Sequence, residues 1–281
     1  MYQPNWVKRN KPITIGHAYS SVVLLPEAAY APGPAWGVPV GVHRVKSSAD
    51  KERVGALQIE ALLDDKELPC YAQLCVQDED SGYSKPAFLA KNRAKTNRVT
   101  ITRARTNRTF DRPPAQTARA GGPPTWYGAP WALPDPTTGP TSDATATTAM
   151  RRLRGQTYQV QLEAWPNMRL PGKCKPAPLP MRLYPFTLVR LRLLNAPGEL
   201  AFQRPLWRMG MGERRRELSV LDSFQADQRR YDMEHFFRFG KQRLLLDRYP
   251  TPDAEHQEQW WRLVHLAYRQ LGVARDMPRK I

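Results

Sequence analysis

The sequence predicts a mixed α/β fold, with a mixed sheet and flanking helices. Segments of strand and helix character alternate over the amino-terminal third in the order strand, strand, helix, strand, helix, strand. Further strand-like segments follow a proline-rich stretch, and long helical segments come last. The chain has 281 residues, of which 41% are hydrophobic, so it has enough apolar material for a substantial core.

In the amino-terminal third, hydrophobic periodicity and turn residues predict the positions of strands and helices. Asp50 is a suitable N-cap for a helix, and the apolar run Tyr71–Val76 is typical of a buried central strand. An acidic cluster follows that run. The expected strands are Thr14–Leu25, Val38–Val45, Tyr71–Val76 and Arg98–Ala104, and the expected helices are Asp50–Leu63 and Lys85–Lys95.

The middle of the chain is expected to combine a long loop with strands. Residues 113–150 contain eight prolines and are rich in Gly, Thr and Ala, which predicts a Pro-rich loop. Beyond it, Gln156–Ala164 and Phe186–Leu194 alternate between apolar and polar residues, as strands do. Leu206–Met211 is a further short strand candidate.

Two helices are expected at the carboxy-terminal side. Residues 217–246 contain no proline, and only Gly240 interrupts their helical character. A second helix, 253–273, follows Pro250 and Pro252 and carries an apolar stripe at helical spacing.

The positive charge is concentrated in one internal segment. The formal net charge is +17, and the segment from Lys85 to Arg192 holds 19 Lys and Arg against 4 Asp and Glu. Arg supplies most of this charge, and aromatic residues are interleaved with it; Arg binds phosphate through a bidentate fork, and aromatic rings stack on bases. We therefore expect nucleic acid as the partner, although a solvated basic face is the simpler alternative.

Other classes of protein are not favoured. No apolar run approaches the length of a membrane span, and the amino terminus lacks the apolar core of a signal peptide, so we expect a cytoplasmic protein without a membrane partner. Three cysteines and five scattered histidines fit neither a disulfide framework nor a zinc site.

Two acids are candidates for catalysis and metal binding. Asp80 follows the expected strand Tyr71–Val76, where α/β sheets tend to place ligands, and Glu234 lies on the long helix near Arg230 and Lys241. Carboxylates from separate elements can hold Mg²⁺ beside a basic surface. Each acid also has a simpler interpretation, because acids favour turns and because Glu234 and Arg230 are spaced as a surface ion pair.

The segment Arg229–Leu246 (RRYDMEHFFRFGKQRLLL) resembles the carboxy-terminal part of insertion-sequence transposases of the DDE superfamily. It is similar in particular to the branch with a tyrosine–arginine–glutamate–lysine signature. Further similar segments cover most of the chain. They are NKPITIGHAYSSVV, DSGYSKPAFLAKNR, QTYQVQLEAW and PFTLVRLRLL.

The resemblance implies an RNase H-like catalytic domain, interrupted by an insertion between the second Asp and the Glu. Residues 1–104 would form its first part, 105–200 the basic β-rich insertion, and 201–281 the rest. Asp80 and Glu234 would be catalytic metal ligands. The residues expected to bind DNA are Arg230, Arg238 and Lys241.

The resemblance also implies a reaction and partners. In the family, two Mg²⁺ or Mn²⁺ ions activate water and then a 3′-hydroxyl for attack on DNA phosphodiesters. The partners would be transposon ends and target DNA, and a homodimer would act on DNA in the nucleoid.

The sequence departs from the family pattern at two points. Asp227 stands where the signature has tyrosine, and no acid ahead of Asp80 ends a first central strand. We therefore expect an amino-terminally truncated transposase with weak or no activity. The alternatives are a non-catalytic nucleic-acid-binding protein and the poorly folded product of a decayed transposase gene.

Overall fold

The fold is known from a computed structural model that describes most of the chain. The described residues are 17–25, 36–47, 50–86, 88–89, 93, 95–114, 126–135, 138–151, 156–171, 173–174, 179–196, 198–249 and 251–275. The chain divides into two compact units. Unit 1 comprises residues 1–65 and 228–281, and unit 2 comprises residues 66–227.

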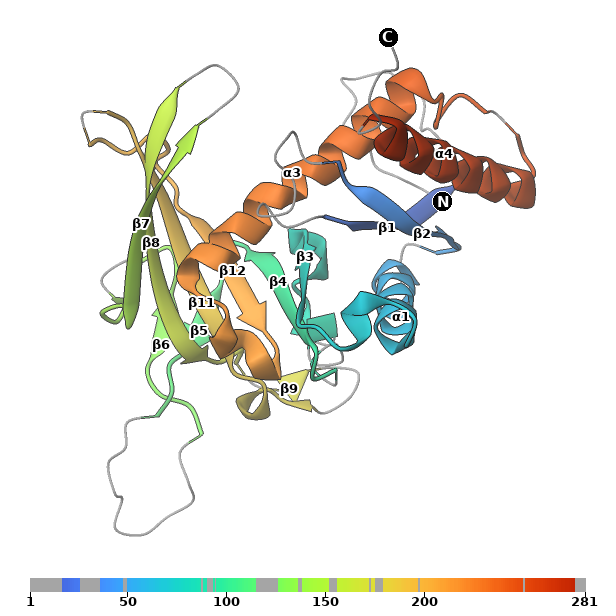
Figure 1. Ribbon diagram of the computed structural model, residues 1–281. Coiled ribbons are helices and arrows are strands. Elements are labelled where there is room, and N and C mark those ends of the chain that lie inside the picture. Colours follow the sequence, from blue (N-terminus) through green and yellow to red (C-terminus); the bar gives the residue numbers. More distant parts are fainter. Residues whose placement is uncertain are drawn as a thin grey trace, which may run out of the picture. The chain divides into compact units, whose positions relative to one another are not determined.

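Unit 2 is built on a six-stranded mixed sheet with the strand order β3-β4-β12-β11-β8-β7 (Figure 1). The strands β3 and β4 are parallel, and every other neighbouring pair in this sheet is antiparallel. The strands are β3 (Cys75–Glu79), β4 (Arg98–Ala104), β7 (Ala144–Arg151), β8 (Thr157–Met168), β11 (Phe186–Leu194) and β12 (Leu206–Met211).

One face of this sheet carries the main apolar core. Alternate residues of β8 and β11 point to this face, as the period of two in a strand requires. The start of helix α3 (Val220–Arg243) packs on them through Phe224, with Val220 and Leu221 at the margin. The buried cluster consists of Tyr158, Val160, Leu162, Ala164, Val189, Leu191, Leu193 and Phe224.

The opposite face carries three buried tryptophans. Trp131 on β6 (Pro130–Ala132) meets Trp165 and Trp207 edge to face, with ring centroids 4.7 and 5.4 Å apart. Strand β6 pairs with β5 (Thr109–Asp111), and Phe110 of β5 contacts Phe186. Edge-to-face pairs add to the stabilisation from burial, so the hairpin β5–β6 closes this side of the core.

Short elements complete unit 2. They are the strand pair β9 (Lys173–Cys174) and β10 (Leu179–Pro180), and the 3₁₀ helices Pro69–Tyr71, Ser81–Tyr83, Met181–Leu183 and Glu213–Glu217.

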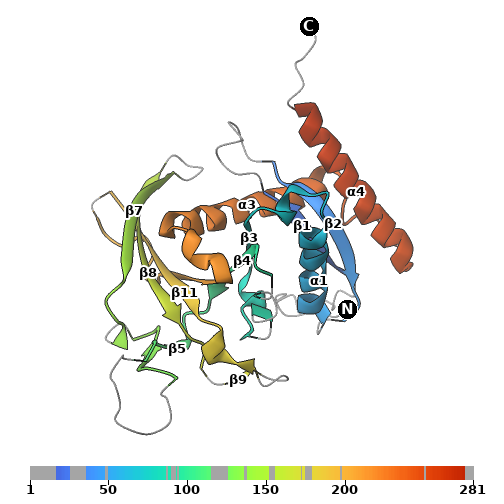
Figure 2. The same ribbon diagram turned by 60° about the horizontal axis from the view of Figure 1, so that its bottom comes forward.

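Unit 1 contains the antiparallel strands β1 (Ala18–Leu24) and β2 (Val38–Val45) with the helices α1 (Lys51–Asp64) and α4 (Ala254–Arg275) (Figure 2). The α3 residues from position 228 onward also belong to it. Aromatic rings hold these elements together, since Tyr19 stacks on Trp261 at 4.6 Å and Trp36 stacks on Tyr268 at 4.4 Å. Tyr268 and Phe236 are fully buried.

Both ends of α3 have local causes. At the start, Ser219 Oγ accepts from the Asp222 amide and Asp222 Oδ2 accepts from the Ser219 amide, which is a capping box. At the end, Leu245 adopts a left-handed conformation with φ 55°, and the Leu246 amide donates to the Gly240 carbonyl. A left-handed residue that redirects the chain to satisfy a helix carbonyl is a common helix end.

The structure confirms the mixed α/β class and most of the expected elements. The expected strands at 38–45, 98–104, 186–194 and 206–211 are β2, β4, β11 and β12, and the expected helices 50–63 and 253–273 are α1 and α4. The expected strand 14–25 is β1 from Ala18, and residues 14–16 lie outside the described residues. In the expected helix 85–95, Pro86, Phe88 and Leu89 are helical, and several other positions lie outside the described residues.

The expected strand Tyr71–Val76 is wrong in part, because only Cys75 and Val76 belong to β3. Pro69–Tyr71 forms a 3₁₀ helix and Tyr71 is exposed, whereas β3 begins at Cys75 and includes the acidic residues Asp78 and Glu79. The strand is also not central, because its only neighbour in the described sheet is β4. The acidic Asp78 can lie in β3 because its carboxylate is close to the Arg208 guanidinium on β12.

The expected loop 113–150 is wrong in part. Residues Ala144–Arg151 form β7, which pairs with β8 over eight positions from Ala144 opposite Ala164 to Arg151 opposite Thr157. Three of the eight residues are threonines, and β-branched residues favour strands. Pro130–Ala132 is β6, and residues 115–125 and 136–137 lie outside the described residues.

The described helices include none that could cross a bilayer.

Candidate nucleic-acid and metal sites

Asp80 lies in unit 2, one residue after β3 ends. Its side chain is exposed, and its Oδ1 accepts a hydrogen bond of 2.7 Å from the Ser81 amide. Asp80 is thereby the N-cap of the 3₁₀ helix Ser81–Tyr83. The position of Asp80 just after a strand agrees with the sequence analysis. The hydrogen bond from Ser81 also supports the simpler interpretation, in which Asp80 caps a turn.

The acids before Asp80 have different surroundings. Burial raises the pKa of Glu79 to about 7; the hydrogen bond from Gln77 Nε2 opposes this shift, and the Asp78 and Asp80 carboxylates add to it. Asp78 is buried, and its Oδ1 lies 3.9 Å from Nη1 of Arg208 on β12. The three consecutive acids therefore differ. Asp78 makes a buried ionic contact, Glu79 is half-buried with a raised pKa, and Asp80 is an exposed cap.

Glu234 lies in unit 1 on the exposed side of α3. Its Oε1 lies 3.4 Å from Nη1 of Arg230, and 53% of its side chain is exposed, so the contact is a weak surface pair. Arg238 and Lys241 are exposed on the same helix. The structure thus brings Glu234 and Arg230 together and leaves Arg238 and Lys241 accessible to a large anionic partner.

The two expected metal ligands belong to different units, Asp80 to unit 2 and Glu234 to unit 1. Within the part of the chain that the structure describes, no three His, Cys, Asp or Glu side chains are grouped as an ion would require. Asp80 and Glu234 are therefore not part of such a group among the described residues.

Asp227, which the resemblance aligns with the signature tyrosine, is buried in unit 2. Its carboxylate contacts Nη2 of Arg208, and the side chains of Asp227 and Arg208 are 6% and 5% exposed. Arg208 therefore lies between Asp227 on α3 and Asp78 on β3. The sequence analysis missed this ionic cluster, because nothing in the spacing of three residues on separate elements links them.

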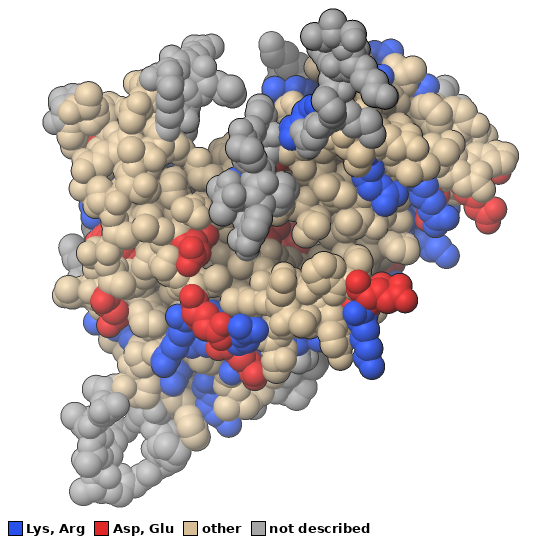
Figure 3. Space-filling view, viewed as in Figure 1, with Lys and Arg blue, Asp and Glu red and all other residues tan. Residues whose placement is uncertain are grey.

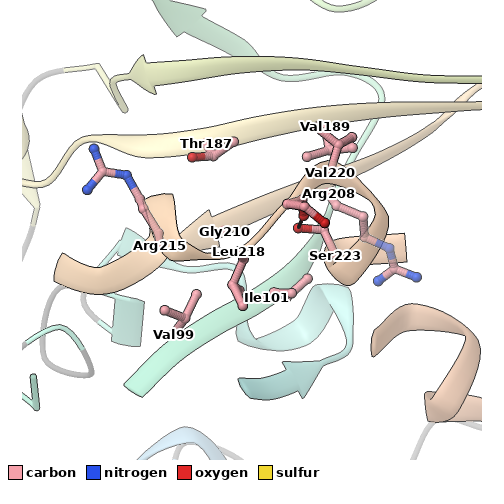
Figure 4. A pocket seen from close by; sticks show the side chains of 11 residues that line it. Val99, Ile101, Thr187, Val189, Arg208, Gly210, Arg215, Leu218, Val220 and Ser223 are labelled. Atoms are coloured by element: carbon pink, nitrogen blue, oxygen red, sulfur yellow. Dashed lines mark hydrogen bonds between the residues drawn. The ribbon is translucent and has the colours of Figure 1, made fainter. Parts of the chain in front are cut away.

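A small cavity lies between the sheet of unit 2 and the start of α3 (Figure 4). Arg208 and Arg215 flank it, and both guanidinium groups point away from its centre. Its volume of about 30 Å³ is far below the roughly 300 Å³ of the smallest usual ligand pockets, so it has room for water and not for a substrate.

The basic residues of unit 2 fall into two groups. Arg190 and Arg192 both bind the Glu163 carboxylate, at 2.6 and 2.8 Å, and Arg214 binds Glu217 at 2.6 Å. On the face shown in Figure 3, acidic and basic side chains accordingly occur together rather than as one continuous basic patch. A second group of arginines donates to neutral groups, and within the described residues it has no carboxylate partner.

This second group includes Arg93, Arg215 and Arg216. Arg215 and Arg216 both donate to Asn167 Oδ1, at 3.0 Å each. The sequence analysis did not select them, although the run of three arginines at 214–216 is visible in the sequence.

No protein-family model matches the chain, and no curated protein is similar to it.

Proposed function

We propose that the chain binds DNA and is related to DDE transposases, with weak or no DNA cleavage of its own. The observation that carries the proposal is the distribution of charge, because 19 basic residues stand against 4 acidic ones between Lys85 and Arg192. A DNA duplex carries one phosphate charge per strand at every step, and Lys and Arg that neutralise phosphates supply most non-specific affinity.

The exposed side of α3 supports the same partner. Arg238 and Lys241 are exposed, and the contact of Arg230 with the exposed Glu234 is 3.4 Å long. In water such a pair contributes little, so replacing it with a phosphate contact costs little. The resemblance aligns Arg230 and Lys241 with DNA contacts of the family.

The proposed fold is RNase H-like. The parallel pair β3 and β4, joined through a segment with helical residues, is the kind of unit found in α/β sheets, and the hairpin β1–β2 followed by α1 is consistent with it. The resemblance supplies the rest of this assignment. The protein would act in the cytoplasm at the nucleoid, as a homodimer on DNA.

The proposed cleavage is weak because only two of the three required carboxylates are assigned. Asp80 and Glu234 would bind Mg²⁺ or Mn²⁺, which would activate the attacking oxygen. The residue at the signature tyrosine is Asp227, and its contact with Arg208 is buried rather than open to DNA. One DNA contact of the family would therefore be replaced by an internal ion pair.

The proposal predicts binding without efficient nicking. A fluorescein-labelled DNA duplex should bind the full chain in low salt, and a supercoiled plasmid incubated with Mg²⁺ or Mn²⁺ should remain largely intact. Glu234→Gln tests the proposed site. Glu255→Gln is its matched control, because Glu255 is an exposed acid on the other long helix.

Robust nicking that Glu234→Gln abolishes and Glu255→Gln preserves would establish an active transposase-type nuclease instead. Absence of DNA binding in low salt would refute the proposed function altogether.

A further inference from the structure

Three arginines of unit 2, Arg93, Arg215 and Arg216, are close enough for the charges of Arg93 and Arg216 to act on Arg215, and they donate hydrogen bonds to neutral groups. They come from separate parts of the chain: Arg93 follows the helical residues 88–89, and Arg215 and Arg216 lie in the 3₁₀ helix Glu213–Glu217. Their exposure is graded, since Arg215 is buried, Arg93 is half-buried and Arg216 is exposed. The group therefore extends from the interior of unit 2 to its surface.

Arg215 is the inner member. Its Nη1 donates to the Gly212 carbonyl at 3.1 Å and its Nη2 donates to Asn167 Oδ1 at 3.0 Å. Its Nε is buried and has no hydrogen-bond partner among the described residues. Burial lowers the pKa of Arg215, and the positive charges of Arg216 and Arg93 lower it further. The protein thus maintains like charges close together at an energetic cost.

Asn167 connects the two neighbouring arginines. Its backbone is left-handed with φ 66°, next to a register shift in the pairing of β8 with β11. Such an irregularity redirects side chains, and Asn tolerates left-handed geometry better than most residues. The Asn167 Oδ1 atom accepts from Arg216 Nη2 as well as from Arg215 Nη2. The amide therefore orients two guanidinium groups without neutralising either.

Arg93 is oriented by the segment before β11. Its Nη1 donates to the Leu183 carbonyl, and its guanidinium carbon lies 5.5 Å from the Tyr184 ring centroid. Its Nε is buried and has no partner among the described residues. A carbonyl and an aromatic ring stabilise a cation but do not cancel its charge.

The neighbouring Arg214 shows what a neutralised arginine looks like in the same helix. It binds Glu217 through Nε and Nη2, at 2.7 and 2.6 Å. In contrast, no carboxylate within the described ranges forms an ion pair with Arg93, Arg215 or Arg216. Unpaired clustered charge in a partly buried site calls for an external anion.

We propose that Arg93, Arg215 and Arg216 bind a phosphate group of the DNA backbone. The inference rests on the proposed DNA-binding function and names the site within it. Guanidinium forks match phosphate oxygens in charge and in geometry, and the buried Arg215 adds its positive charge to that of the more accessible Arg93 and Arg216. Asn167 is a positioning residue, because it acts through the arginines.

The test compares DNA binding by four variants of the full chain. Arg93→Gln, Arg216→Gln and Asn167→Gly affect the site, and the glycine keeps the left-handed backbone available. Arg214→Gln is the matched control, because it removes the same charge from the same 3₁₀ helix where Glu217 already neutralises it. Affinity for a labelled duplex is measured over a series of KCl concentrations.

We expect Arg93→Gln and Arg216→Gln each to bind about tenfold more weakly than the wild type, as for the loss of a hydrogen bond to a charged group. The slope of log affinity against log salt should become shallower by about 0.9 for each phosphate contact that is lost. Asn167→Gly should show the same change in slope to a smaller extent, and Arg214→Gln should keep the wild-type slope.

A second measurement separates a DNA phosphate from a free phosphate ion. Thermal denaturation is followed in inorganic phosphate and in chloride at equal ionic strength. Stabilisation by phosphate that Arg216→Gln abolishes, together with unchanged DNA affinity in all variants, would overturn the proposal in favour of a free anion site.

Equal DNA affinities and slopes in all four variants and the wild type would also overturn it, while leaving the proposed DNA-binding function intact. A wild-type protein that binds no DNA would overturn both.

Discussion

The Asp227 carboxylate contacts the Arg208 guanidinium inside unit 2, where both side chains are almost fully buried. Asp78 approaches the same guanidinium from β3 at 3.9 Å. The three residues come from α3, β12 and β3, so the ionic cluster connects the helix to two strands of the sheet. Removing one member of a buried ion pair leaves the other charge poorly compensated.

Asp227→Ala is therefore expected to lower the free energy of unfolding by about 3–5 kcal/mol, as measured by urea denaturation. The control is Asp143→Asn, an exposed acid of the same unit, which should change it by less than about 0.5 kcal/mol. The double variant Arg208→Met/Asp227→Leu should lose less stability than Asp227→Ala. An Asp227→Ala protein as stable as the control would contradict the role of the pair.

Glu79 predicts a pH dependence of stability. Burial raises its pKa to about 7 in the folded protein, above the ordinary glutamate value of 4.5 that applies when the chain is unfolded. The folded state then binds more protons between these values, so stability should fall as the pH rises from about 4.5 to about 7.

The measurement for Glu79 is the unfolding free energy of the wild type and Glu79→Gln at a series of pH values. Relative to the wild type, the variant should gain stability across this window and hold the gain at higher pH. A constant difference between the two proteins at all pH values would show that Glu79 does not titrate differently on folding.

The Ser219 side chain should stabilise the start of α3. Its hydroxyl accepts from the Asp222 amide at 3.1 Å, which satisfies a helix donor that has no partner within the helix. Ser219→Ala should cost about 1 kcal/mol of unfolding free energy. Ser223→Ala, one turn later, lacks this capping role and is the control; equal losses in the two variants would argue against the cap.

Replacing Gly272 with alanine should destabilise the protein, although alanine is the better helix former. A Cβ atom at this position of α4 would lie 2.5 Å from Nε1 of Trp36, which donates to the Tyr268 carbonyl and stacks on the Tyr268 ring. Gly272→Ala should lower the thermal midpoint, although alanine in a helix is favoured by about 1 kcal/mol over glycine. The exposed Gln270→Ala should leave the midpoint nearly unchanged, and a higher midpoint for Gly272→Ala would mean that Trp36 moves freely.

Elements with a strong internal pattern could be predicted from the sequence. Phe186–Leu194 alternates cleanly and forms β11, and the apolar stripe of the last helix marks α4. The sequence analysis did not use the capping box of Ser219 and Asp222, which places the start of α3 three residues later than the expected 217.

Elements that depend on distant partners could not be predicted. The strand β3 includes Asp78 because Arg208, far away in the sequence, compensates its charge, whereas Tyr71, at the start of the apolar run, belongs to the 3₁₀ helix Pro69–Tyr71. The threonine-rich β7 forms because β8 offers an edge over eight positions. The arginine site could not be predicted for the same reason, because Asn167, which orients Arg215 and Arg216, is nearly fifty residues away in the sequence.

The central claim is that this chain binds DNA through its phosphates, and the salt dependence of duplex binding tests it most directly. The affinity of the wild-type chain for a labelled duplex, measured from low to high KCl, should fall linearly on logarithmic axes with a slope of several units. Arg214→Gln should reproduce that slope and Arg216→Gln should reduce it. Absent binding in low salt, or binding that does not change with salt, would contradict the claim.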